Sequence, residues 1–360
     1  MLRARGAAIN QRRSKHMRHA KMIGAAALVA LFALSGCAAA GEAPSESTED
    51  AVSGTLTNPD PVSIAIFGSG PASGMERLAF ENGFAEDRGV KLDKTYSVVS
   101  GKEIGAALVN GSAQFGSLTT MVAQPLIEQG ECFRFLTAGE RNIYEFIAKP
   151  ELKLDDFESY PENLLGLKGK RIGVSALGTL GETLATNVLV EAGLKPGDVT
   201  FVATGGVASA VAAFQEGQVD ATWSFAPQLQ IYAADEYTKL TNFVGGDSDG
   251  VMGQYIQHVF ATTCDYAEKN PEVVQAVCKA VWDAYDFAND EANTKAMGEF
   301  FATSLAVDSK IGAAFWKQYS PTFPAAAISK EAYNALGEVG VVQPDFTGHV
   351  DSGCSAADPR

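Results

Sequence analysis

The sequence has few of the residues from which metal sites and nucleophilic catalytic sites are built. It contains 4 histidines, of which only His258 and His349 follow residue 36, and it has no CxxC pair. Zinc sites need several clustered Cys and His ligands, so we expect no metal. Neither histidine lies in a Ser/His/Asp signature. We therefore expect no catalytic residue, no cofactor and no enzyme activity.

Motifs for nucleotides and calcium are incomplete as well. The sequence has no P-loop, and Gly68-x-Gly70-x-x-x-Gly74 misses the dinucleotide-binding spacing by one residue. Residues 247–250 resemble a fragment of a calcium loop without its Glu, which is typical of a solvated turn. Lys and Arg number 28 against 43 Asp and Glu, a net charge of −15. Nucleic-acid binding needs a basic surface, so that class is excluded.

What basic charge there is gathers at the start of the chain. Residues 1–36 hold seven basic residues and no acidic one, and residues 22–34 form an apolar run of 13. A bilayer span needs roughly 20 residues, which favours a cleaved signal segment. Leu34-Ser35-Gly36-Cys37 resembles the bacterial lipobox and predicts lipidation at Cys37. The alternatives are an ordinary signal peptide with an incidental Cys, or an uncleaved short anchor.

Two segments after the signal fit an exported chain. Residues 37–60 are mostly small and acidic without a large aromatic, which predicts a flexible tether. Four further cysteines are an even number, which permits two disulfides. The short loop between Cys264 and Cys278 favours that pair and leaves Cys132 with Cys354. Buried free thiols are the alternative.

The rest of the sequence alternates between predicted strands and helices. Strands are predicted at residues 62–67, 96–99, 114–116, 133–137, 142–148, 171–174, 199–203 and 220–222. Capping-box patterns at Ser73, Ser100 and Thr179, each with Glu three residues later, predict helix starts, the first helix running to Glu86. Residues 207–216 predict another helix, and the chain is largely helical from Pro271. This order predicts an α/β fold with mostly parallel sheets.

A weak repeat suggests two similar halves. Residues 106–113 (AALVNGSA) are similar to residues 212–219 (AAFQEGQV), and each copy combines a predicted helix, a Gly and a short strand. Each copy also follows an earlier strand–loop–helix unit. The repeat predicts two similarly built lobes in succession. The alternative is that Ala-rich helix–turn–strand units look alike by coincidence.

Four loops at predicted strand ends are small and hydroxylated. Ligands of open α/β sheets bind beyond the carboxyl ends of the strands, where helix N-termini attract anions. The candidate ligand-binding residues there are Ser69, Gly70, Ser117, Thr119, Thr120, Ser175, Gly178, Thr179 and Gly205. For any single loop, helix capping alone is the alternative.

Three larger side chains complete the candidate site. Trp223 and Phe225 follow the second copy of the repeat, where an aromatic ring can stack on a ligand. For Trp223 an ordinary core position is the alternative. Arg141 lies between two predicted strands and is suited to bidentate binding of a carboxylate or sulfonate. A surface ion pair with Glu140 or another neighbour is equally consistent with the sequence.

Three strings carry a family resemblance. They are residues 165–174 (LGLKGKRIGV), 192–199 (AGLKPGDV) and 214–223 (FQEGQVDATW). In this order they resemble ABC-transporter substrate-binding lipoproteins of the nitrate/sulfonate/taurine-binding family, over roughly residues 61–345. The resemblance implies a two-lobed type II periplasmic-binding-protein fold, with hinge crossings near residues 148–165 and 245–258. Lobe 1 would comprise residues 61–150 and 251–350, lobe 2 residues 151–250, and a tail residues 351–360.

The resemblance also implies a function, with two departures. Gly166 stands where the family usually has Asp, which affects only a turn. Residues 225–227 (FAP) stand where the family often has an acidic residue before Pro, so the family's ligand is not carried over. The implied role is a lipid-anchored, extracytoplasmic monomer that passes a small organic anion to an ABC permease and ATPase. The alternatives are an enzyme on the same scaffold, such as a thiamine-pyrimidine synthase, and a TRAP-type or sensory binding protein.

Overall fold

The computed structural model describes Leu56 and residues 59–68, 70–154, 160–244, 251–338 and 340–355. The predicted signal segment, Cys37, most of the tether and Ser69 lie outside these residues. Leu56 falls within the tether expected at residues 37–60, yet it packs partly buried against the first hydrophobic core, beside Gly89. Ordered chain therefore begins earlier than the composition indicates.

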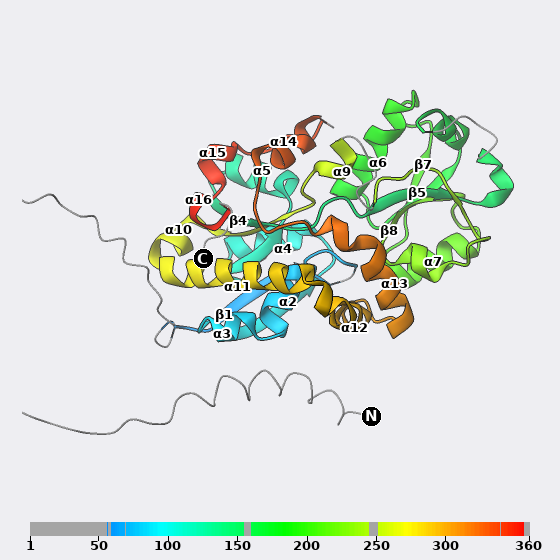
Figure 1. The fold of residues 1–360 in the computed structure, drawn as a ribbon. Coiled ribbons are helices and arrows are strands. Elements are labelled where there is room, and N and C mark those ends of the chain that lie inside the picture. The colour runs from blue at the N-terminus through cyan, green and yellow to red at the C-terminus, as the bar shows by residue number, and fades with distance from the viewer. Residues whose placement is uncertain are drawn as a thin grey trace, which may run out of the picture. The chain divides into compact units, whose positions relative to one another are not determined.

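The strands form two five-stranded sheets, and Figure 1 shows each group flanked by helices. The first sheet has the order β2 (Leu92–Val98), β1 (Val62–Phe67), β3 (Phe115–Leu118), β10 (Val259–Thr263), β4 (Phe133–Ala138). The second has the order β7 (Thr200–Ala203), β6 (Arg171–Val174), β8 (Ala221–Phe225), β5 (Tyr144–Ala148), β9 (Thr238–Lys239). The predicted α/β class is confirmed. The sheets are mixed rather than mostly parallel, because β10 and β5 each run antiparallel to both neighbours.

The two sheets have the same plan. In each, one strand pairs in parallel with two others, β1 with β2 and β3, and β6 with β7 and β8. The two copies of the sequence repeat end in β3 and β8, which occupy equivalent places. The structure therefore contains two similarly built α/β units, as the repeat predicted.

The antiparallel strands mark where the chain crosses between the sheets. β4 belongs to the first sheet and β5 to the second, so the first crossing is residues 139–143. This is earlier than the expected 148–165, because β5 pairs with β8 along its whole length instead of extending the first sheet. The chain returns between β9 and β10, and residues 245–250 of the expected second crossing lie outside the described residues.

Helices follow most strands and dominate the end of the chain. Before Cys264 the described helices are α2 (Gly74–Glu81), α3 (Phe84–Asp87), α4 (Gly101–Val109), α5 (Thr120–Glu128), α6 (Leu180–Glu191), α7 (Val207–Gln215), α8 (Gln228–Ile231) and α9 (Val251–Gln254). From Cys264 onward come α10 (Cys264–Lys269), α11 (Pro271–Asn289), α12 (Thr294–Ser304), α13 (Ser309–Tyr319), α14 (Lys330–Glu338), α15 (Phe346–His349) and α16 (Ser352–Ser355). Short 3-10 turns are η1 (Pro150–Leu152), η3 (Glu162–Leu167), η4 (Glu291–Asn293) and η5 (Ser320–Thr322). The helical C-terminal part is thus confirmed. None of the described helices combines the length and apolar character that a membrane crossing requires.

The first sheet is buried on both faces, because successive strand residues point to opposite sides. On one face Ile64, Phe115 and Phe260 pack with the buried stripe of α11. On the other, Leu118 and Val259 pack with α4. Hydrophobic burial on two faces explains why these strands read as short continuous apolar runs rather than alternating ones.

Only one of the three predicted capping boxes forms. Thr179 Oγ1 accepts from Glu182 N–H at 3.5 Å, and the Glu182 carboxylate accepts from Gly178 N–H. Ser100 makes no side-chain cap. Ser73 has φ 62°, and its Oγ accepts from Phe67 N–H at 3.2 Å instead of capping α2, which ends at Glu81, not Glu86. The spacing of Ser or Thr and Glu therefore predicted where the helices begin. Which of these side chains actually caps a helix depends on tertiary contacts.

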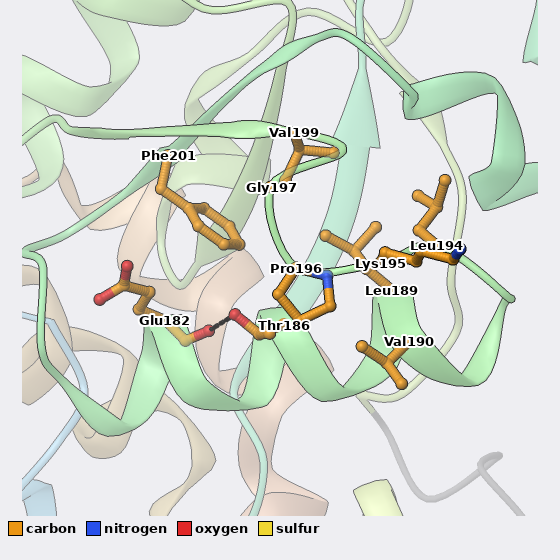
Figure 2. Close-up of a pocket in the computed structure, with 10 residues that line it drawn as sticks. All are labelled: Glu182, Thr186, Leu189, Val190, Leu194, Lys195, Pro196, Gly197, Val199 and Phe201. Atoms are coloured by element: carbon orange, nitrogen blue, oxygen red, sulfur yellow. Dashed lines mark hydrogen bonds between the residues drawn. The ribbon is translucent and has the colours of Figure 1, made fainter.

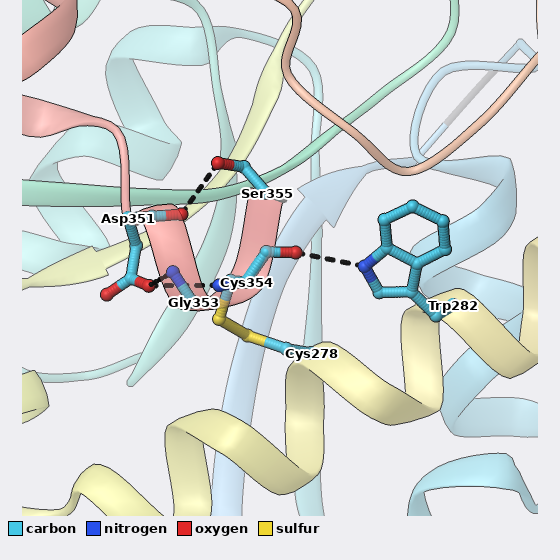
Figure 3. Close-up of a disulfide and its surroundings, with 6 residues drawn as sticks. All are labelled: Cys278, Trp282, Asp351, Gly353, Cys354 and Ser355. Atoms are coloured by element: carbon cyan, nitrogen blue, oxygen red, sulfur yellow. Dashed lines mark hydrogen bonds between the residues drawn. A yellow bond between two sulfur atoms is a disulfide. The ribbon is translucent and has the colours of Figure 1, made fainter. Parts of the chain in front are cut away.

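Two disulfides are present, with a connectivity that differs from the expected one. Cys132 pairs with Cys264, and Cys278 with Cys354. Cys132 and Cys264 flank the antiparallel strands β4 and β10, where Thr263 lies opposite Phe133, so their Cα atoms are 5.4 Å apart. Cys278 projects from α11 toward α16, and Figure 3 shows the bridge beside Trp282, whose Nε1 donates to Cys354 O at 2.9 Å. The predicted pairs Cys264–Cys278 and Cys132–Cys354 are wrong, because strand pairing, not loop length, set which thiols meet.

Candidate functional site

The candidate loops follow the carboxyl ends of parallel strands in both sheets. In the first sheet they lie between β1 and α2 and between β3 and α5. In the second they lie between β6 and α6, between β7 and α7, and between β8 and α8. In such sheets this edge is where ligands bind. The two edges must approach one another for a ligand to touch both.

Direct contacts join the two edges. Gly70, with φ +77°, lies against Phe225, since a Cβ there would sit 3.4 Å from the Phe225 ring. Met121, near the start of α5, accepts a hydrogen bond at Sδ from Thr183 Oγ1 on α6, at 3.8 Å. We call these contacts the intersheet junction. It brings together the loops after β1 and β8, and the starts of α5 and α6.

Two buried hydroxyls near the junction lack hydrogen-bond partners. Ser117 is the third residue of β3 and Thr119 directly precedes α5, and the hydroxyl of neither pairs with any described residue. Ser117 is fully buried and Thr119 is 6% exposed. Buried hydroxyls are nearly always paired, so an exception needs a reason such as a missing ligand or water. These two candidates therefore retain the capacity to bind a ligand.

Thr120 and Thr179 are occupied by protein partners. Thr120 Oγ1 donates to Gln343 Oε1 at 3.1 Å. Thr179 Oγ1 donates to Ala176 O at 2.9 Å in addition to capping α6. A ligand that uses either hydroxyl must compete with these bonds. The backbone N–H groups at the starts of α5 and α6 are better suited than these hydroxyls to donate hydrogen bonds to an anion.

The other loop residues lie further from the junction. Gly178 is exposed, and its N–H is bonded to the carboxylate of Glu182. Gly205 follows the edge strand β7 and is exposed, and a Cβ there would lie 2.8 Å from Ser209 Oγ in the first turn of α7. Ser175 is half-buried at the end of β6. The structure thus brings Gly70 and Phe225 together and leaves Gly178 and Gly205 at the periphery.

Trp223 lies in the core of the second sheet. Its ring is stacked on Tyr144 at 5.4 Å and packs on Phe146 at 4.6 Å, and the residue is 1% exposed. This environment favours the core alternative over stacking on a ligand. Its Nε1 nevertheless has no partner among the described residues. Phe225, two residues later on the same strand, is the aromatic that reaches the junction.

Arg141 lies in the first crossing. Its backbone N–H donates to Thr322 O at 2.7 Å, and the residue is half-buried. Within the described part of the chain its guanidinium makes no hydrogen bond or ion pair. Glu140, the alternative partner, turns the other way and is 1% exposed. The sequence-based suggestion of an Arg141–Glu140 surface pair is therefore wrong, and the cation is available to an anion.

The sequence analysis missed a buried charge cluster at the base of the two crossings. His258 Nε2 lies 2.9 Å from Glu76 Oε1, and its Nδ1 lies 3.4 Å from Glu140 Oε1. Burial lowers the pKa of His258, but Glu140 and Glu76 more than offset this and raise it to about 10. The imidazole is therefore a cation at neutral pH. Gly139 makes room for it, because a Cβ there would lie 2.3 Å from the ring.

This cluster has a structural role rather than that of a metal site. No three His, Cys, Asp or Glu side chains of the described ranges are arranged to hold an ion. The two crossings are hydrogen-bonded beside it, Gly139 N–H to His258 O at 2.9 Å and Gln257 N–H to Glu140 O at 2.8 Å. The sequence analysis interpreted Glu76 as part of a capping box at the start of α2. It therefore did not predict that the Glu76 carboxylate pairs with His258.

Two surface pockets lie away from the candidate residues. One of about 210 Å³ is formed by α6 and the segment that follows it, with Leu189, Pro196 and Phe201 among its lining residues (Figure 2). The other, of about 370 Å³, lies where Leu56 and Asp60 meet the start of α11. Neither is lined by a candidate residue, so cavity shape does not identify the site.

Comparisons with known proteins agree on the fold. The family model described as "NMT1/THI5 like" matches residues 78–293. The taurine-binding periplasmic protein of Escherichia coli K12 is 32% identical over 206 residues, which cover 57% of this chain and 59% of that protein. The chain thus spans 59% of the length of this curated relative.

Two solved structures show the same architecture at low identity. The alkanesulfonate-binding protein SsuA from Xanthomonas axonopodis pv. citri, bound to MOPS, has a TM-score of 0.59 at 20% identity, covering 77% of this chain and 90% of that one. The Candida albicans CA3427 product, described as having the generic periplasmic binding protein fold, has a TM-score of 0.57 at 13% identity, covering 83% and 98%. The chain has the periplasmic-binding-protein fold and belongs to the NMT1/THI5-like family, which relates it to the nitrate-, sulfonate- and taurine-binding proteins.

Proposed function

We propose that this chain is an extracytoplasmic solute-binding lipoprotein that captures a small organic anion and delivers it to an ABC importer. The observation that carries the proposal is the intersheet junction, where loops from the carboxyl ends of both sheets meet. The family and the names of the relatives support binding and transport rather than catalysis. The lipid anchor at Cys37 and a monomeric state are part of the proposal.

The proposed mechanism is closure of two lobes around the ligand. Lobe 1 is built on the first sheet and lobe 2 on the second, with the crossing at residues 139–143 and the return between β9 and β10 as hinges. A ligand that touches both lobes favours the closed state. The starts of α5 and α6 supply N–H groups, Arg141 supplies a cation, and Phe225 supplies apolar contact. These groups fit a sulfonate or carboxylate with an apolar part.

Replacing Ser117 tests the site directly. Ser117→Ala removes a buried, unpaired hydroxyl, so we expect stability to stay the same or to rise by up to about 1 kcal/mol. If the hydroxyl donates to the ligand, affinity falls about tenfold. The protein starting after Cys37 is screened with taurine, an alkanesulfonate, nitrate, an aromatic carboxylate and a thiamine-type pyrimidine. A ligand at 100 times its dissociation constant stabilises the protein by about 2.7 kcal/mol, a shift of several degrees.

Ser224 provides the matched control. It is as fully buried as Ser117, but its Oγ donates to Gln228 Oε1 at 3.0 Å. Ser224→Ala therefore lowers stability by about 1 kcal/mol, since it leaves a buried acceptor unpaired. Loss of stability in Ser117→Ala without loss of affinity contradicts the assignment. Chemical conversion of a bound probe would show that the protein is an enzyme and would contradict the proposed binding function.

Replacing Cys37 tests the anchor. Cys37→Ser removes the thiol that the lipobox pattern marks for acylation, so the variant is expected to leave the membrane fraction or to accumulate as precursor. Intact mass and membrane fractionation of the wild type and the variant measure this. An unacylated wild type cleaved at another residue refutes the anchor and leaves ligand binding untouched.

A further inference from the structure

The C-terminal segment makes a third connection between the two sheets, besides the two crossings. Along α14, Ala332 and Tyr333 pack in the core of the first sheet with Leu118 and Phe135. One turn later, Ala335 and Leu336 pack in the core of the second sheet with α6 residues. Because the buried residues of α14 pack in the hydrophobic cores of both sheets, this helix links the two sheets. We call residues 330–338 and 340–345 the strap.

Further contacts attach the strap and the residues after it to both sheets. Val341 is buried in the second core, and a Cβ at Gly340 would lie 3.9 Å from Asn187 Nδ2 on α6. Beyond the strap, Asp351 N–H donates to Phe135 O at 2.8 Å and Arg134 donates to Gly348 O at 2.9 Å. The Cys278–Cys354 disulfide then ties the end to α11. Figure 1 shows α14 beside α9, the short helix that precedes β10.

One strap side chain reaches the candidate site. Gln343 Oε1 accepts from Thr120 Oγ1 at 3.1 Å, while its Nε2 donates to Tyr333 O at 2.8 Å. Thr120 is 3% exposed and is the first residue of α5. The next residue, Met121, contacts Thr183 across the junction. Gln343 therefore fixes the start of α5 at the point where it meets the second sheet.

We propose that Gln343 is a positioning residue of the ligand site, and that the strap couples placement of Thr120 to the approach of the two sheets. The first part rests on the proposed function, because it takes the start of α5 as part of the site. The second part concerns the fold alone. Loss of the amide oxygen frees the first turn of α5, and loss of the amide nitrogen loosens the strap at Tyr333.

Variants of Gln343 separate these contributions. Gln343→Ala removes both bonds, whereas Gln343→Glu keeps an acceptor for Thr120 and loses the donor to Tyr333. Val342→Ala is the matched control, because Val342 is the adjacent residue and is 68% exposed. Hydrogen exchange without ligand is expected to speed up about fivefold or more at the first turn of α5 in Gln343→Ala only. Peptides of the strap exchange faster in both Gln343 variants.

The ligand arm uses taurine and an alkanesulfonate. We expect Gln343→Ala to weaken binding about five- to tenfold, and Gln343→Glu to retain more affinity than Gln343→Ala. Thr120→Val combined with Gln343→Ala is expected to weaken binding no more than either change alone, since both remove one interaction. Wild-type affinity in Gln343→Ala with unchanged exchange overturns the proposal. If neither probe binds the wild type, the proposed function fails, and the exchange arm alone decides the strap, with unchanged exchange overturning it.

Discussion

Replacing His258 by Gln is expected to lower the free energy of unfolding by about 3–5 kcal/mol. The imidazole lies between the carboxylates of Glu76 and Glu140, and all three side chains are at most 1% exposed. Removing the cation leaves two buried negative charges without compensation, which is the costly way to break a buried ion pair. Urea unfolding at pH 7 measures the loss.

The same cluster predicts a pH dependence. The pKa of His258 is raised to about 10, above the ordinary value near 6.5. In the unfolded chain the imidazole loses its proton near pH 6.5, while the folded protein keeps it until about pH 10. Its contribution to stability is therefore complete below pH 6.5 and is lost as pH rises toward 10. Wild-type stability should fall over this window, and the decline should be smaller in His258→Gln.

Two controls make the result specific. His349 is partly buried, its Nδ1 lies 3.1 Å from Phe133 O and its ring packs on Phe135, but no carboxylate faces it among the ion pairs of the described residues, so His349→Gln should cost much less. Adding Glu140→Gln to His258→Gln removes one uncompensated charge and should restore part of the lost stability. Equal losses in the two histidine variants, or no recovery in the double variant, would contradict the buried ion-pair interpretation.

The sequence predicted the strands and the presence of two similar α/β units well, because both depend on residues that are close together in the sequence. Residues 62–67 and 171–174 are strands over their predicted lengths, and the repeat ends in equivalent strands of the two sheets. The crossing was placed too late because the local sequence of β5 (YEFIA) fits a strand of either sheet. Only its pairing with β8 assigns it to the second one.

The candidate site was predicted in part. Gly70 and Phe225 meet, although they are far apart in sequence, because both follow strands whose carboxyl ends face the junction. The partners of Glu76 and Thr120 could not be predicted. His258 and Gln343 lie 182 and 223 residues away from them, and no local spacing links such pairs. Capping signals also compete with tertiary contacts, as Ser73 shows.

Removing either disulfide is expected to cause the second large loss of stability. Chain-entropy arguments assign about 4–5 kcal/mol to each bridge, since the linked residues are 132 and 76 positions apart. Measured values are more often about 2–4 kcal/mol, so Cys132→Ala/Cys264→Ala and Cys278→Ala/Cys354→Ala are each expected to lose that much stability. Non-reducing peptide mapping should recover 132 linked to 264 and 278 linked to 354. A peptide pair joining Cys264 to Cys278 would refute this connectivity.

The two bridges should differ in where the structure loosens. Cys132–Cys264 joins neighbouring strands that are already hydrogen-bonded, Cys264 N–H to Cys132 O at 3.0 Å, so its loss acts mainly through the unfolded chain. Cys278–Cys354 fastens the four-residue helix α16 to α11, and without it the hydrogen bond from Trp282 to Cys354 O and the burial of Cys354 and Ser355 must hold that helix in place. Removing this bridge should therefore speed hydrogen exchange in residues 346–355 and, through them, in the strap, whereas the Cys132–Cys264 variant should leave those peptides unchanged. Because both variants lose similar global stability, exchange that rises equally in both would show that the bridge does not hold the strap in place.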